Sequence, residues 1–256
     1  MPAAEAGRLR VVREPFSERP AFGAAVSRAI LLRVAEGELP PTMRLHRTTR
    51  ILAFGRHDAA SPGFDDAVRA ARATGFEPIV RLAGGRAAVY HEGTIALSRA
   101  IHDPRPAART HARFEVIAEL IAAALRRLGV DARVGEVPGE YCPGAYSVNA
   151  RGRSKLVGIG QRIIAGGAHL GAVIVVRDGA LVRDALLPVY EALGLEWDPA
   201  TAGSVEDELG SADLGTVEDA ILAEFEAAGN QLVTATLDSE TLALAERLTD
   251  AHRPPG

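Results

Sequence analysis

The chain has 256 residues and a formal net charge of −4, from 29 basic and 33 acidic side chains. This length suits one domain, or one domain with a small appendage, and a composition that is 47% hydrophobic and 24% charged is ordinary for a globular protein. The charge excludes the basic footprint expected of a nucleic-acid-binding domain. The single cysteine excludes an internal disulfide framework and any metal site built from several cysteines.

Hydropathy indicates that the protein does not enter a membrane. No stretch approaches the ~20 consecutive apolar residues that a membrane-spanning helix needs. Residues 1–16 lack the apolar core of a signal peptide. Together with the lone cysteine, these features predict a protein of the reducing cytoplasm.

The first part of the chain alternates between helical and strand-like patterns. In chain order the patterns predict a helix, two short strands joined at Thr48-Thr49, a second helix that ends at Gly75, and three strands. These elements are expected over residues 20–37, 43–57, 63–74, 76–82, 86–90 and 93–99.

The second part opens with the clearest helical pattern, over residues 110–129, and closes with two further helices. Between them we expect a strand, a Pro/Gly-rich loop, a hairpin that turns at Ala150–Gly152, a buried strand, and a helix interrupted or kinked near Pro188. These elements, with the two final helices, are expected over residues 130–136, 137–145, 146–164, 168–179, 180–194, 215–229 and 238–251.

This order of elements predicts an α+β fold with a mixed, mostly antiparallel sheet flanked by helices. An acidic, glycine-containing composition begins near residue 195, before the last two helices. We therefore expect one domain over residues 1–200, followed over residues 201–256 by an acidic linker and a small helical tail.

A glycine pair lies between two of the predicted strands, in the segment RLAGGRAAVYH. Gly84 and Gly85 have no Cβ, so their backbone can approach a ligand closely and present amide groups to an anion. Arg81 and Arg86 can supply positive charge for a carboxylate or a phosphate. Taken alone, a glycine pair between strands is more often a tight turn.

Lys155 is the only lysine in the chain, and it lies in the strand-like segment SKLVG that ends at Gly158. A lysine in a partly buried pocket can hold an anionic or carbonyl group. The alternative is a solvated lysine on a strand. Because arginine supplies every other basic side chain, a retained lysine favours a role that needs a compact ammonium group.

Cys142 and two histidines complete the candidates. A lone cysteine is usually a small apolar core residue, but a position within the Pro/Gly-rich loop also suits a nucleophile. His91 and His169 are candidate bases or ligand contacts, and each could equally be structural.

In this order, the segments RLAGGRAAVYH, SKLVGIGQR and AHLGAVIVV resemble the catalytic domain shared by lipoate–protein ligases, octanoyltransferases and, more distantly, biotin–protein ligases. The upstream segment ILAFGRHD resembles the family strand that ends in Gly-Arg. The resemblance covers roughly residues 20–195. It implies a biotin/lipoate protein ligase-like catalytic domain over residues 1–200.

The resemblance also implies roles for individual residues. Lys155 would touch the reactive carbonyl as a catalytic residue. The substrate-binding residues would be those of the glycine loop and of the following strands, namely Arg81, Gly84, Gly85, His91, Gly158 and His169. The apolar strands around them would form a slot for an octanoyl or lipoyl chain. No metal ligand is assigned.

Two departures from the family pattern separate the possible mechanisms. The family loop usually has a second arginine and a third glycine, where this chain has Val80 and Arg86. The ligases tend to carry Asn-Asp shortly before the lysine strand, a carboxylate suited to magnesium and ATP, whereas this chain reads CPGAYSVN. A subgroup of octanoyltransferases places a nucleophilic cysteine in this region, where Cys142 lies.

Our expectation from the sequence is a lipoate–protein ligase-like enzyme, which would use ATP and magnesium to attach lipoate or octanoate to a lysine through an acyl-adenylate. The first alternative is an octanoyltransferase without a cofactor that uses Cys142 as nucleophile, and the second is a non-catalytic acyl-binding protein. The implied partners are lipoyl domains of 2-oxoacid dehydrogenase complexes or the glycine cleavage H protein, with an acyl-carrier protein as a possible donor. Neither nucleic acid nor a membrane is expected as a partner.

Overall fold

The computed structural model describes residues 7–254. Its main feature is an eight-stranded sheet in the order β11-β1-β2-β6-β10-β9-β8-β7. β1 pairs in parallel with β11 and β2, and all other neighbours in this sheet are antiparallel. In chain order the strands are β1 Gly7–Val12, β2 Thr42–Arg47, β6 Thr94–His102, β7 Ala132–Val134, β8 Val148–Ala150, β9 Ser154–Ile164, β10 Gly167–Val175 and β11 Asn230–Thr234.

A second, three-stranded sheet has the order β4-β3-β5 and consists of β3 Ile51–Phe54, β4 Glu77–Val80 and β5 Ala88–Tyr90. The two strands expected on either side of Thr48-Thr49 both exist, but β2 belongs to the large sheet and β3 to the small one. The chain therefore passes from the large sheet to the small sheet at this dipeptide.

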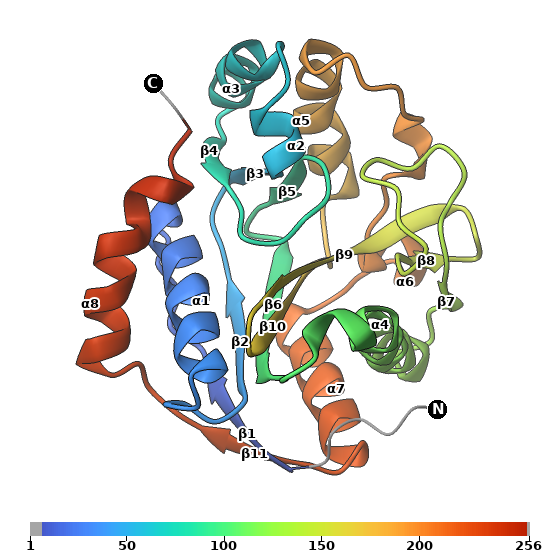
Figure 1. Ribbon diagram of the computed structural model, residues 1–256. Helices are drawn as coiled ribbons and strands as arrows, with labels where there is room; N and C mark the ends of the chain where they lie inside the picture. The colour runs from blue at the N-terminus through green and yellow to red at the C-terminus, as the bar shows by residue number, and fades with distance from the viewer. Residues whose placement is uncertain (1–6, 255–256) are drawn as a thin grey trace.

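Helices cover both faces of the large sheet (Figure 1). α1 and α8 pack together on one face, and α4 and α7 pack together on the other, where the largest apolar core lies. α3 and α5 pack against each other beside the small sheet. The helices are α1 Pro20–Ala35, α2 Arg56–Ala59, α3 Phe64–Ala73, α4 Thr110–Arg127, α5 Gly179–Ala192, α6 Val205–Leu209, α7 Leu214–Ala227 and α8 Ser239–Leu248, with 3-10 turns at Pro106–Arg109, Pro199–Thr201 and Thr249–His252.

The α+β class and the mixed, mostly antiparallel sheet expected from the sequence are confirmed. α3 ends before Gly75, whose φ of 81° is the left-handed conformation that glycine adopts at a helix C-terminus. The interruption expected in α5 does not occur, because Pro188 lies inside a continuous helix. The buried neighbours Val189 and Tyr190 hold the last turn against the second core despite the missing hydrogen-bond donor.

The chain after residue 200 contributes to the same sheet and to both of its faces. Strand β11, which the sequence patterns did not predict, pairs with β1 from Gly7↔Asn230 to Val11↔Thr234. α7 packs on α4 and α8 packs on α1. Within residues 7–254 no helix combines the length and the hydropathy needed to cross a membrane.

Candidate active site

Cys142 lies in the loop between β7 and β8, half-buried, with a φ of 45° that is unusual for a residue other than glycine. Its Sγ accepts a hydrogen bond from the backbone N–H of Arg86 at 3.1 Å. The Arg81 guanidinium lies 3.7 Å from the same sulfur. The backbone N–H of Cys142 donates to the Tyr190 hydroxyl at 2.9 Å, which fixes the loop from its other side.

Lys155 is 1% exposed and donates three hydrogen bonds, to Glu140 Oε1 at 3.0 Å and to the carbonyl oxygens of Tyr141 and Cys142 at 2.9 and 2.7 Å. An ammonium group has three protons, so these bonds use all of them. None of the three reaches Sγ. In this structure Lys155 therefore holds the loop that carries the cysteine.

Glu140 is the buried counter-charge of Lys155, and the sequence reasoning did not identify it. Its carboxylate also accepts bonds from the backbone N–H groups of Val137 and Gly144, each at 3.1 Å, and from the Ser147 hydroxyl at 2.6 Å. A buried charge needs a partner. The burial of Lys155 would therefore have been the signal for a nearby carboxylate. Glu140 meets that need, and it lies in the same Pro/Gly-rich segment as Cys142.

The glycine loop passes directly over the cysteine. Gly85 has a φ of 100°, and a Cβ at this position would lie 2.9 Å from Cys142 Sγ and closer still to the Arg81 guanidinium. Gly84 donates its backbone N–H to the Gln161 carbonyl at 3.2 Å. Gly85 is therefore required by its close packing against the cysteine and Arg81, whereas a Cβ added at Gly84 would meet the Gln161 carbonyl oxygen at an ordinary 3.6 Å.

Arg86 joins the cysteine to a second buried carboxylate, that of Asp58. While its backbone N–H donates to Sγ, its guanidinium lies 3.2 Å from Asp58 Oδ1. The other oxygen of Asp58 accepts the backbone N–H of Gly55 at 2.9 Å. Asp58 also escaped the sequence reasoning, although it belongs to the segment ILAFGRHD.

Arg81 connects the cysteine to a cavity. Its Nη2 donates to the Arg86 carbonyl at 2.7 Å, and its Nε has no hydrogen-bond partner in the described structure. Burial alone would lower the pKa of Arg81, but the neighbouring Cys142 and Tyr90 raise it, so the guanidinium remains charged. Arg81 lines the cavity, whereas Cys142, which Arg81 contacts, is not among the residues that line it.

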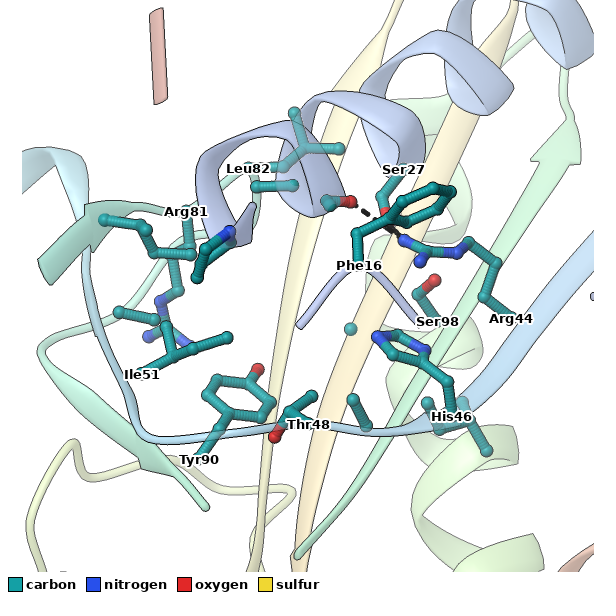
Figure 2. A pocket seen from close by; sticks show the side chains of 18 of the residues that line it. Phe16, Ser27, Arg44, His46, Thr48, Ile51, Arg81, Leu82, Tyr90 and Ser98 are labelled. Atoms are coloured by element: carbon teal, nitrogen blue, oxygen red, sulfur yellow. Dashed lines mark hydrogen bonds between the residues drawn. The ribbon is translucent and has the colours of Figure 1, made fainter. Parts of the chain in front are cut away.

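The cavity has a volume of about 120 Å³ and lies between α1, the strands β2, β6 and β10, and the small sheet (Figure 2). Its lining is mostly apolar. Its wall includes Phe16, Pro20, Ala24, Ile51, Ala53, Ile79, Leu82, Ala83, Ala96, Leu97 and Ala172. It also includes the polar side chains Arg44, His46, Thr48, Arg81, Tyr90, Ser98 and His169.

The remaining candidates occupy different places. His169 lines the cavity, and burial followed by the nearby Arg44 lowers its pKa to about 3, so the ring is neutral. Gly158 lies beside Lys155, where an added Cβ would meet Lys155 Cε at an ordinary 3.5 Å. His91 lies outside the cavity, in the turn before β6, and its Nδ1 accepts the backbone N–H of Gly93 at 3.0 Å.

The α+β sheet, the glycine loop packed over a cysteine and the adjoining apolar cavity are the features of an acyl-handling domain. The chain belongs to the lipoyl protein ligase A/B catalytic domain family, whose model matches residues 19–226. Within that family it is an acyltransferase enzyme.

Curated relatives carry octanoyltransferase names. An octanoyl-[GcvH]:protein N-octanoyltransferase of Bacillus velezensis is 28% identical over 239 residues, which cover 88% of this chain and 82% of the relative. A protein of the same name from Anoxybacillus flavithermus is 31% identical, over 66% of this chain and 59% of the relative.

Solved structures of ligases share the fold. A lipoate-protein ligase A bound with ATP superposes with a TM-score of 0.74 at 20% identity, covering 96% of this chain and 94% of the ligase. A putative lipoate protein ligase of Thermoplasma acidophilum with bound lipoic acid gives a TM-score of 0.72 at 21% identity, covering 96% and 95%. At these identities the likeness establishes the fold.

Proposed function

We propose that this enzyme transfers an octanoyl group to a lysine of a lipoyl domain through a thioester on Cys142, with the octanoylated glycine cleavage H protein as donor. The observation that carries the proposal is the environment of Sγ, which receives the Arg86 N–H and faces the Arg81 guanidinium beside an apolar cavity. The names of the relatives support the same reaction.

In the first step, the thiolate of Cys142 attacks the carbonyl carbon of the octanoyl amide on the donor lysine. A C–S bond forms, the C–N bond breaks, and the leaving amine takes up a proton. In the second step the amine of the acceptor lysine attacks the thioester, loses a proton and releases the thiolate. Both steps are acyl transfers, so neither needs an oxidant or a nucleotide.

Both the thiolate and the developing oxyanion are negatively charged, and Arg81 is positioned to stabilise both. Its Nη2 faces the sulfur, and its unpartnered Nε is a donor available to a carbonyl oxygen in the adjoining cavity. Lys155 acts as a positioning residue, because its three protons hold Glu140 and the backbone on either side of the cysteine.

The acyl tail would occupy the apolar part of the cavity. Burial of ~7 methylene groups at about 0.8 kcal/mol each contributes about 5–6 kcal/mol to binding. That contribution is large enough to select a medium-length chain without a charged contact along its middle.

The alternative route through ATP and magnesium would require a carboxylate that is free to bind the metal. The two carboxylates that border the cysteine and glycine loops are buried and already engaged. Glu140 is bonded to Lys155, and Asp58 to Arg86. These residues therefore do not fit a magnesium–ATP complex.

The test is incubation of the purified chain with an octanoylated H protein and an apo lipoyl domain, followed by intact-mass measurement. We expect the octanoyl mass to move to the lipoyl domain without ATP, and a single octanoyl adduct to accumulate on Cys142 when the acceptor is omitted. An octanoyl-acyl-carrier protein in a parallel reaction identifies the preferred donor.

Cys142→Ala is the matched variant, and we expect it to abolish both the adduct and the transfer. Transfer that proceeds only from free octanoate or lipoate with ATP, and survives Cys142→Ala, would contradict the thioester route. No turnover with any donor would favour a non-catalytic acyl-binding protein.

A further inference from the structure

The glycine loop between β4 and β5 contacts three different elements. Leu82 packs against the core cluster formed mainly by α1. The backbone N–H of Gly84 donates to the Gln161 carbonyl of β9 at 3.2 Å. A Cβ added at Gly55, the residue before α2, would collide with the Gly85 carbonyl oxygen. In Figure 1 the loop accordingly lies below α2, beside α1 and above β9.

Each of these three elements carries an arginine, namely Arg28 on α1, Arg56 at the start of α2 and Arg162 on β9, and we call them the arginine cluster. Arg162 pairs in register with His169 of β10, which lines the cavity, so both side chains lie on the same face of the large sheet. Burial, followed by the charges of Arg56 and Arg28, lowers the pKa of Arg162. The three cations are therefore close enough to act on one another.

The positive charge of the arginine cluster is not neutralised within the described part of the chain. Elsewhere on the surface an arginine often has an acidic partner, as Arg19 has in Glu246 at 2.7 Å. Arg28, Arg56 and Arg162 form no ion pair with an acid among residues 7–254. Arg56 is exposed and the other two are half-buried, so the cluster is accessible. Like charges that lie close together repel, and an anionic partner would offset that repulsion.

The end of the chain closes the fourth side of the loop. His252 is 3% exposed, its Nδ1 donates to the Val80 carbonyl at 2.7 Å, and its Nε2 has no partner among the described residues. Burial lowers the pKa of His252, the bond to Val80 raises it, and the charges of Arg28 and Arg56 lower it again, with a lowered pKa as the result. The ring is therefore neutral near pH 7, and the arginines supply the charge.

The arginine cluster lies next to the reacting sulfur but outside the cavity. A Cβ at Gly85 would lie 2.9 Å from Cys142 Sγ, so the glycine loop separates the sulfur from the residues around the loop. None of the three cluster arginines lines the cavity. A substrate lysine must bring its amine to Sγ on a side chain of only four methylene groups. The protein that carries this lysine must therefore cover the surface near the glycine loop.

We propose that the arginine cluster binds carboxylate groups on the surface of the lipoyl domain or H protein that presents the substrate lysine. The inference rests on the proposed function, since it names the surface on which the same lysine-bearing partner docks. Three arginines from separate elements distribute their charge around the loop, which suits several carboxylates on a protein surface better than one small anion. Such charges at the rim of an interface mainly accelerate association and select the partner.

The test is direct binding of the apo H protein and of an apo lipoyl domain by biolayer interferometry. Cys142→Ala serves as the background, so that no acyl transfer takes place. In the combined variant Arg28→Gln/Arg56→Gln/Arg162→Gln, we expect Kd to rise about tenfold, mainly through slower association. Binding of the parent chain should weaken as sodium chloride is raised, and binding of the variant should depend less on salt.

The matched control removes the same charge elsewhere, as Arg8→Gln/Arg72→Gln/Arg153→Gln, from exposed positions in β1, α3 and the turn between β8 and β9. We expect this control to bind like the parent chain. Lysine at all three cluster positions keeps the charge and should retain most of the binding. Equal binding by the glutamine variant and its parent would overturn the proposal, as would a parent chain that binds neither protein.

Two further measurements identify the anion and separate this proposal from the reaction. Titration with ATP should show no affinity that depends on the cluster; tight ATP binding that the glutamine variant loses would instead assign the cluster to a nucleotide. With Cys142 present, the octanoyl thioester of N-acetylcysteamine, a small uncharged donor, should acylate the wild type and the glutamine variant at equal rates. An unreactive wild type would contradict the thioester route, whereas the binding data would still decide the docking surface.

Discussion

Replacement of Lys155 by methionine should release the cysteine loop and destabilise the whole fold. The variant loses three hydrogen bonds and leaves the Glu140 carboxylate buried with only its neutral donors. Removal of one partner of a buried ion pair typically costs about 3–5 kcal/mol. Because a domain has a total stability of about 5–15 kcal/mol, the midpoint of urea unfolding should fall substantially.

The double variant Glu140→Gln/Lys155→Met is the matched control, because it removes the orphaned charge. We expect it to recover most of the lost free energy of unfolding, as an apolar or neutral replacement of a buried pair often does. Trp197, the single tryptophan of the chain, has its ring 5.7 Å from that of Tyr141 and reports on the loop by fluorescence.

Activity in the same variants tests whether the cysteine loop must be held by Lys155 for the reaction to occur. Lys155→Arg keeps the charge, but its planar fork cannot meet the three acceptors that surround Nζ, so it should lose most activity. The double variant should regain stability but not thioester formation, because the carbonyl oxygens of Tyr141 and Cys142 still lack the donor that holds the cysteine loop. Unfolding of Lys155→Met within about 1 kcal/mol of wild type would refute the reasoning, since that is the size of an ordinary surface effect.

Three further predictions concern the surroundings of the cysteine and the cavity. Gly85→Val should abolish the octanoyl adduct, because its side chain would collide with Cys142 Sγ and Arg81, while circular dichroism stays close to that of wild type; an intact adduct would contradict the packing described. Tyr190→Phe should cost about 1–2 kcal/mol, since the Cys142 N–H loses its acceptor, and an unchanged urea midpoint would count against that contact. The pKa of His169 is lowered to about 3 in the folded state, so the unfolded chain binds more protons below pH 6.5 and stability falls as the pH falls, by up to about 1.4 kcal/mol per pH unit. His169→Leu should reduce that dependence between pH 6.5 and 4.5, and an unchanged slope would contradict it.

Local patterns in the sequence were sufficient to predict much of the fold. Helical periodicity placed α1 and α4 within a few residues of their observed ends, and glycine marked the end of α3. β11 escaped detection because its five residues have exposed or half-buried side chains after Asn230, so they show no apolar alternation. That strand exists because the parallel partner β1 lies beside it, which is a long-range fact.

The sequence by itself determined the family, through three segments in a fixed order, and it brought Cys142, Lys155 and the glycine pair into consideration. Only the tertiary structure decided how they act together. From the sequence alone, Lys155 could be expected to contact the substrate. In the structure it donates its three protons to Glu140 and to the cysteine loop. The distant Arg44 became part of the cavity only through strand register with Ser98, because pairing between strands joins residues whose separation along the chain carries no periodic signal.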